Sequence, residues 1–240
     1  KSNNLIRNFN TNVFEKSNIN DLTFASYPKI TKKGFYNNYN FIIKNSNTDG
    51  QNSSNFKENE NYYISGLFQY NSSLPLVKET KKYKKILKPK LSLKLAPQNS
   101  KNISDQDVRI DLNNLYSLNR ISEDDVIEGG ASIVLGNDFS IFDKQNLNEI
   151  FNLKLANNLR FDENKDLPTN NQIGQKTSNF FGEAYYKPYD FLTTKYSASI
   201  KNNLSDMSYE NFVTTLSINN FVTTFDYLNE NNTLKKNSYL

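Results

Sequence analysis

The chain has 240 residues, of which 36% are hydrophobic and 22% charged, and its formal net charge is +4. It contains neither Cys nor His, which excludes thiol and imidazole catalysis, intrachain disulfides and the usual zinc sites. The mean hydropathy of -0.73 and the lack of any run of about 18 apolar residues argue against a helical membrane protein. The 15 Tyr and 17 Phe supply buried area that a disordered chain lacks, so we expect a folded domain.

Apolar residues recur at every second position along much of the chain, the pattern of β-strands with two unlike faces. Near the start, weaker candidates lie around residues 5–14 and 22–29. Clearer apolar sets follow at Phe35, Tyr39, Phe41 and Ile43, and then at Tyr62, Ile64, Phe68 and Tyr70. Most runs reach the roughly 9–11 residues that cross a bilayer when tilted, whereas a common globular strand has about 5–6.

Residues 78–90 contain seven lysines and lead into the next predicted strand. That strand has an apolar face at Leu87, Pro89, Leu91, Leu93 and Leu95, and a polar face at Lys88, Lys90, Ser92, Lys94 and Ala96. The lysine cluster could bind lipid phosphates or an acidic partner. We favour the alternative of a solvated turn followed by lysines that face the interior of a barrel.

Residues 98–129 form a long connection that is rich in carboxylates: Asp105, Asp107, Asp111, Glu123, Asp124 and Asp125. Such oxygens suit a divalent cation, but the spacing and Gly of an EF-hand are absent, so we favour a solvated loop. We expect no catalytic residue, no metal and no cofactor here. Arg120 is expected to pair with Asp125 and to hold the loop inside the lumen, and Gly129 with Gly130 to permit a tight bend before the next strand.

The second half of the chain has the clearest alternation. Phe151, Leu153, Leu155, Leu159 and Phe161 share one face, and Asn152, Lys154, Ala156, Asn158 and Arg160 share the other. Further apolar sets are Ile133, Leu135, Phe139 and Ile141; Leu192, Tyr196, Ala198 and Ile200; Phe212, Leu216 and Ile218; and Phe221, Phe225 and Tyr227, with a weaker candidate at 178–187. Each of these sets predicts one more strand.

The predicted connections alternate in length, as an up-and-down barrel with short turns at one end and long loops at the other requires. Short connections lie near 30–34, 142–149, 188–190 and 219–220, and long polar ones near 46–61, 98–129 and 162–177. The connections at 72–83 and 203–208 fit less well, because the first is long and the second short. Asn219 and Asn220 fit a two-residue hairpin, since Asn tolerates positive φ.

We therefore predict an all-β fold: an antiparallel up-and-down transmembrane β-barrel, as an open slice of a larger barrel with about 11–12 strands. Residues 1–240 are expected to be part of one such domain without an internal boundary. Both ends of the sequence look like strands, so the chain is expected to be an internal fragment whose edges pair with strands outside it.

One segment resembles a motif of the LptD family, the lipopolysaccharide-assembly proteins of Gram-negative outer membranes. The segment is Asn114-Leu-Tyr-Ser-Leu-Asn-Arg120, followed by Asp125, Ile127, Glu128 and Gly129, and Ser178-Asn179-Phe180-Phe181-Gly182 is similar to a second family motif. The resemblance covers roughly residues 74–230. The chain departs from the family pattern at Ile121, Glu123, Val126 and Asn179. The matching motif residues, expected to structure a lumenal loop, are Asn114, Asn119, Arg120, Asp125, Glu128, Gly129 and Gly182.

The resemblance implies a barrel in the cell outer membrane that receives lipopolysaccharide from the periplasmic bridge protein LptA. It implies that the plug lipoprotein LptE sits inside the barrel and that the glycolipid leaves through a lateral seam into the outer leaflet. The implied partners are therefore lipopolysaccharide, these two proteins and outer-membrane lipid, with no nucleic acid. No chemistry in the barrel is implied, so the protein is not expected to be an enzyme.

Two other classes remain open from the sequence. Another outer-membrane barrel, such as a porin or a receptor-type transporter, would have the same strand pattern. A soluble β-sandwich binding module would instead have strands of about 5–6 residues and a core between two layers.

Overall fold

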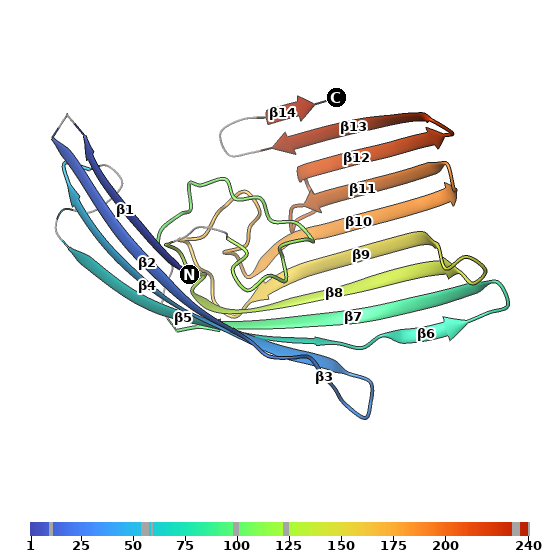
Figure 1. Ribbon diagram of the computed structural model, residues 1–240, viewed down its shortest axis with the longest axis horizontal. Helices are drawn as coiled ribbons and strands as arrows, with labels where there is room; N and C mark the ends of the chain where they lie inside the picture. Colours follow the sequence, from blue (N-terminus) through green and yellow to red (C-terminus); the bar gives the residue numbers. More distant parts are fainter. Residues whose placement is uncertain are drawn as a thin grey trace.

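The computed structural model describes residues 1–9, 12–53, 58, 60–97, 101–121, 125–231 and 236–239, and these form one sheet of fourteen strands (Figure 1). The strands are β1 (Ser2–Phe9), β2 (Val13–Ala25), β3 (Lys29–Ile30), β4 (Tyr36–Gln51), β5 (Asn61–Ser73), β6 (Leu76–Glu79), β7 (Tyr83–Ala96), β8 (Gly130–Asp143), β9 (Glu149–Arg160), β10 (Thr177–Tyr189), β11 (Leu192–Ile200), β12 (Met207–Ile218), β13 (Phe221–Asn231) and β14 (Lys236–Tyr239). No helix of the described residues is long and apolar enough to cross a membrane.

The strands follow one another in chain order across the sheet, and each pair of adjacent strands is antiparallel. Only β3 and β6 leave this path: β3 pairs with β4, and β6 pairs with β7. The path through the described residues thus has twelve strands, in agreement with the predicted 11–12. An up-and-down antiparallel sheet is confirmed, and β1 and β14 form its two edges, which lie apart in Figure 1.

The structure explains the two connections that fitted the predicted alternation of lengths less well, 72–83 and 203–208. Residues 72–83 contain β6, and the chain turns only at its end, where the Thr80 amide donates to the Tyr83 carbonyl at 2.8 Å. The connection between β11 and β12 is a short loop closed by Lys201, whose amide donates to the Asp206 carbonyl at 2.9 Å. The predicted hairpin is also confirmed: Ile218 pairs with Phe221, and Asn219 has a φ of 49°.

Some predicted boundaries were wrong at the beginning of the chain. The candidate 5–14 spans the connection between β1 and β2, and the candidate 22–29 begins near the end of β2. Strand β4 continues to Gln51, so the connection predicted at 46–61 is shorter. The reason is that backbone pairing with β2 continues through Gln51, although the outward side chains there are polar and give no alternation.

The outer face of the sheet carries the apolar side chains that the alternation predicted. Strand register aligns them into rows, for example Phe24, Phe41, Phe68 and Leu95, and Leu87, Phe139, Leu153, Ala184, Tyr196, Phe212 and Tyr227. Many of them are exposed; Leu155, for example, is 53% accessible. No second layer of described residues covers this face. The β-sandwich alternative is therefore wrong.

The inner face is concave, and two long loops fold onto it (Figure 1). These loops share an apolar core with the inner side of β8, β9 and β10; they are the loop at 101–129, of which residues 101–121 and 125–129 are described, and the loop at 161–176. The loop members are Ile103, Ile110, Leu115, Ile121, Val126, Leu167 and Ile173, and the strand members are Val134, Ala156 and Phe181. The interior of the barrel wall is therefore partly apolar, which strand alternation alone did not predict.

Replacing Gly136 with Ala is expected to destabilise the protein by about 1–3 kcal/mol because the site has no room for a Cβ atom. That atom would lie 2.7 Å from the Leu155 carbonyl oxygen and 2.9 Å from the Ala156 Cβ, and it would collide with the Tyr116 hydroxyl. The effect is measured by unfolding the full-length protein in detergent, with its heat-modifiable electrophoretic mobility as the readout. Gly182→Ala is the control, since its Cβ would meet nothing closer than Leu155 Cδ2 at 3.5 Å. Equal losses in the two variants would contradict the interpretation.

Candidate functional site

The loop at 101–129 lies inside the concave face although much of it has no regular secondary structure. Buried backbone carbonyls need hydrogen-bond donors, and here side chains supply them. The Leu115 carbonyl accepts from Arg120 Nη1 at 3.4 Å, the Tyr116 carbonyl from Gln69 Nε2 at 2.7 Å, and the Ser117 carbonyl from Lys94 Nζ. Because Gln69 and Lys94 stand on β5 and β7, the sheet itself holds this loop.

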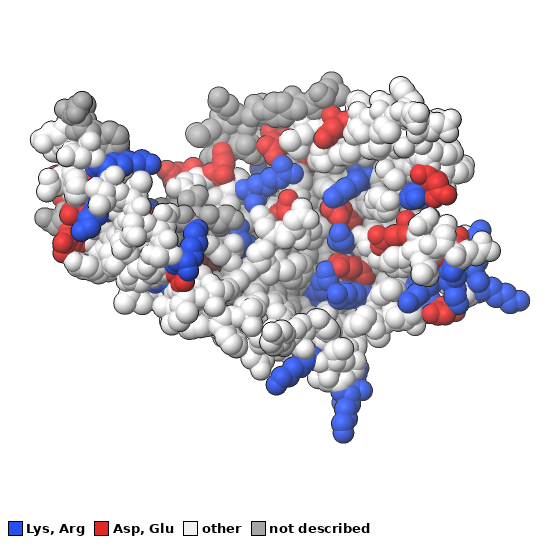
Figure 2. All heavy atoms as spheres, viewed as in Figure 1, with Lys and Arg blue, Asp and Glu red and all other residues white. Residues whose placement is uncertain are grey.

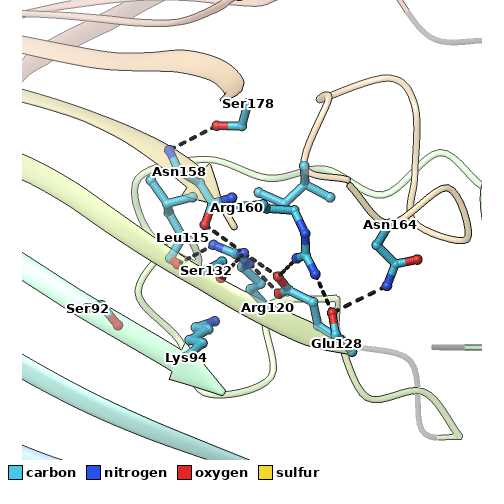
Figure 3. A network of polar contacts seen from close by, with 12 residues as sticks. Ser92, Lys94, Leu115, Arg120, Glu128, Ser132, Asn158, Arg160, Asn164 and Ser178 are labelled. Atoms are coloured by element: carbon cyan, nitrogen blue, oxygen red, sulfur yellow. Dashed lines mark hydrogen bonds and ion pairs between the residues drawn. The ribbon is translucent and has the colours of Figure 1, made fainter. Parts of the chain in front are cut away.

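A buried carboxylate, that of Glu128, joins the loop to the sheet (Figure 3). Arg120 binds it with two hydrogen bonds, from Nε to Oε2 at 2.6 Å and from Nη2 to Oε1 at 2.5 Å. Arg160 of β9 binds the same Oε1 through Nη1 at 2.7 Å and also donates to the Gly129 carbonyl. Arg120 Nη2 further donates to Asn158 Oδ1 at 2.9 Å. Two guanidinium groups from different parts of the chain thus share one carboxylate.

This network keeps Glu128 ionised. Burial by itself would raise the pKa of the Glu128 carboxyl, but the positive charges of Arg120, Lys94 and Arg160 around it outweigh burial and lower the pKa to about 2. The carboxylate is therefore negatively charged at any physiological pH. Its removal would leave buried cations without their counter-charge, which costs far more than the loss of a surface ion pair.

The predicted pair between Arg120 and Asp125 is wrong. Asp125 instead forms a salt bridge with Lys101 at 2.5 Å, at a more exposed position, and Glu128 takes its place as the partner of Arg120. The physical reason is depth: Glu128 is 5% exposed and lies beside β8 and β9, whereas the Asp125 side chain is 23% exposed. Only the deeper carboxylate can meet both arginines.

The other motif residues are spread over the loop and the sheet. Asn114 closes a turn of the loop, since its Oδ1 accepts from the Asp111 amide at 2.9 Å and its Nδ2 donates to the Arg109 carbonyl at 2.8 Å. Asn119 is half-buried in the same loop. Gly129 contributes its carbonyl to Arg160, and the bend predicted at the glycine pair falls on Gly130, with a φ of 89°.

Gly182 lies apart from this site, on the outer face of β10 beside Leu155 of β9. The acidic loop has Glu123 and Asp124 outside the described residues. Among the residues that the structure describes, no group of three carboxylates is arranged to hold a metal ion.

Sequence reasoning missed the strand side chains that complete the site: Lys94, Ser132, Asn158 and Arg160. The alternation of apolar and polar residues along each strand does place these side chains on the inner face, and this pattern could have marked them as candidates. Their partners lie in a loop that is far away in the sequence, so alternation could not show which of them meet.

A second contact holds the loop at the far side of the concave face. Arg109 forms a salt bridge with Glu230 of β13 at 3.1 Å, and its guanidinium lies 4.7 Å from the centre of the Tyr209 ring on β12. The loops also hold each other, because the Ile103 amide donates to the Asp166 carbonyl at 2.7 Å. The loop at 101–129 therefore bridges the inner wall from β5 to β13.

A sheet that is apolar on its outer face and polar on much of its inner face, with long loops folded inside, has the structure of a transmembrane β-barrel wall. The family comparison agrees with this class. The chain belongs to the LptD family, because the family model described as LPS transport system D matches residues 21–240. The match extends beyond the 74–230 of the visible motifs and assigns the chain to a family of outer-membrane proteins for lipopolysaccharide transport. The comparison with curated proteins found no match.

Glu128→Gln is expected to destabilise the protein by about 3–5 kcal/mol, because Arg120 and Arg160 would be left buried without an anion. Unfolding of the full-length protein in detergent measures the change. Asp125→Asn is the matched control: its pair with Lys101 is more exposed, so we expect a loss of at most about 1 kcal/mol. Similar losses in both variants would show that burial does not set the strength of this network.

The Glu128 network should be insensitive to pH until the medium is strongly acidic. A group whose pKa falls from its ordinary 4.5 to about 2 on folding stabilises the fold above 4.5, and this contribution is lost as the pH falls towards 2. Pepsin cleavage of the loop at 101–121 in the full-length protein, followed across this range, measures its release. In Glu128→Gln the acid dependence from this group should vanish. A transition centred near neutral pH in the wild type would contradict the assignment.

Proposed function

We propose that the chain forms part of the wall of the lipopolysaccharide translocon, which receives the glycolipid from a periplasmic bridge and inserts it into the outer leaflet. The observation that carries the proposal is the family match over residues 21–240. The two faces of the sheet support it, because one wall must meet acyl chains outside and sugars inside.

The proposal includes the whole chain as part of one barrel domain. The strand order from β1 to β14 supports it, since each described strand on this path pairs with the next one. We further propose that the motif residues keep the loop at 101–129 folded in the lumen, with Glu128 as the central contact. Their role in this proposal is structural and involves no reaction.

The proposed partners are the bridge protein LptA, the plug lipoprotein LptE and outer-membrane lipid. The exposed apolar rows on the outer face support the contact with lipid, since they offer hydrocarbon to acyl chains. The concave inner face offers the side on which a plug protein would lie (Figure 1). A porin or receptor-type transporter would share these features, and the family match favours lipopolysaccharide over their solutes.

Depletion of the full-length protein from cells should abolish display of newly made lipopolysaccharide at the surface. Labelling by an impermeant reagent or antibody measures the display, and the wild-type gene should restore it. A porin gene from the same cells, expressed at the same level, is the control and should restore nothing. Normal display together with reduced solute uptake would support the porin alternative and contradict the proposal.

A further inference from the structure

A row of charged side chains crosses the inner wall from β7 to β11, at one level of the sheet. Figure 2 shows it as a column of alternating blue and red groups on the hollowed face. Strand register sets the alternation: Lys88 lies opposite Asp138, Asp138 opposite Lys154, and Lys154 opposite Glu183. The row consists of Lys88, Lys90, Asp138, Lys154, Glu183 and Lys195, and we call its four lysines the lysine belt.

The charged row contains four lysines and two carboxylates. Asp138 pairs with Lys90, and Glu183 is shared by Lys154 at 2.7 Å and Lys195 at 2.8 Å. Lys88 has no ion-pair partner among the described residues. The belt therefore keeps an excess of positive charge after all of these pairs have formed.

Glu183 is more buried than the lysines that it binds, whereas the side chains of Asp138 and Lys90 differ little, at 20% and 27% exposed. The Glu183 side chain is 8% exposed, whereas the side chains of Lys154 and Lys195 are 35% and 43% exposed. An anion that approaches from the concave side thus meets ammonium groups first.

Two cavities on the inner face border the belt. One has a volume of about 360 Å³ and is lined by three lysines and two glutamates, with amide and hydroxyl side chains beside them: Lys154, Lys187, Lys195, Glu149, Glu183, Asn148, Asn152 and Tyr185. The other has a volume of about 310 Å³ and is lined by Lys88, Lys90, Asn38, Asn71 and Tyr116, among others. Each cavity combines ammonium groups with amide or hydroxyl donors, a combination that suits a charged group attached to a sugar.

We propose that the lysine belt binds phosphoryl groups carried on the sugar of the transported glycolipid. A phosphoryl group has several oxygens that accept charge-assisted hydrogen bonds at once, and Lys supplies a compact charge with three donors. Because each ammonium group has three donors, phosphoryl oxygens can accept hydrogen bonds from these lysines while Glu183 and Asp138 keep their ion pairs. Binding of a phosphoryl group follows from the belt itself. The proposal rests on the proposed function only where it names the transported glycolipid as the molecule that carries this group.

Inorganic pyrophosphate is the first probe, titrated into the full-length protein in detergent and followed by calorimetry. We expect saturable binding that weakens with salt. Lys154→Gln with Lys195→Gln should weaken it by about tenfold, whereas Lys154→Arg with Lys195→Arg should retain it. The matched control is Lys78→Gln with Lys81→Gln, which removes the same charge from exposed positions outside the belt and should leave binding unchanged.

Glu183→Gln separates a binding belt from a structural ladder. It removes the competing acceptor from two lysines, so a binding belt should gain affinity for pyrophosphate by up to about tenfold. A structural ladder would lose stability and gain no affinity. Unchanged or weaker pyrophosphate binding in a folded Glu183→Gln variant would overturn the proposal.

The second probe identifies the source of the phosphoryl group. Lipopolysaccharide with intact phosphates should bind the wild type more tightly than the same lipid after enzymatic dephosphorylation, and the Lys154/Lys195 glutamine variant should lose this preference. Pyrophosphate binding with no preference for the phosphorylated glycolipid would overturn the assigned source. The proposal would be overturned if the wild type bound no pyrophosphate and the belt variants instead released an acidic protein from the lumen. The belt would then bind a protein partner. Surface display of lipopolysaccharide tests the proposed function separately from both probes.

Discussion

The structure depends on the two-residue period of the β-strand in a setting where every backbone group must be paired. In hydrocarbon an unpaired amide or carbonyl is costly, so strands cross a bilayer only within a sheet whose neighbours satisfy each other. Adjacent residues of a strand then point to opposite faces. Leu87 belongs to an outer apolar row and Lys88 to an inner charged row, and the same pairing of strands aligns both rows across the wall. One set of backbone hydrogen bonds therefore builds a hydrophobic surface and a charged surface together.

The interior shows how a polar wall can hold an irregular loop. The loop brings unpaired carbonyls to a concave surface, and side chains of β5 and β7 donate to them. It also brings Glu128, whose charge is needed by Arg120 and by Arg160 of the sheet. An apolar core around Phe181 and Val134 packs between the loop and the wall. Hydrogen bonds to the loop backbone and burial of the loop's apolar side chains act together here. The loop is therefore packed against the wall as part of the folded protein.

This arrangement suits the passage of an amphipathic molecule. The outer face is apolar and so matches acyl chains, whereas the inner face is polar and matches sugars and charged groups. The lysine belt gives the inner face a specific chemistry at one level of the wall, with lysines presented to the lumen and Glu183 below them. The loop at 101–129 lies on the same concave side and contacts the wall at both of its flanks, through Glu128 with Arg160 and through Arg109 with Glu230. The family match indicates a role in lipopolysaccharide transport, and the two unlike faces of the sheet are those of an outer-membrane barrel wall.

The sequence by itself determined the strands, their two faces, the antiparallel order and the family, because alternation, turn residues such as Asn219 and the motif around Arg120 are local signals. It misplaced the ends of β1, β2 and β4, because there backbone pairing continues where the apolar alternation stops. Only the tertiary structure decided that Arg120 binds Glu128 and Arg160 and not Asp125, and that the lysines form a belt with Glu183. Those contacts join residues from separate strands and loops, and their choice depends on depth in the wall and on strand register, which no local pattern encodes.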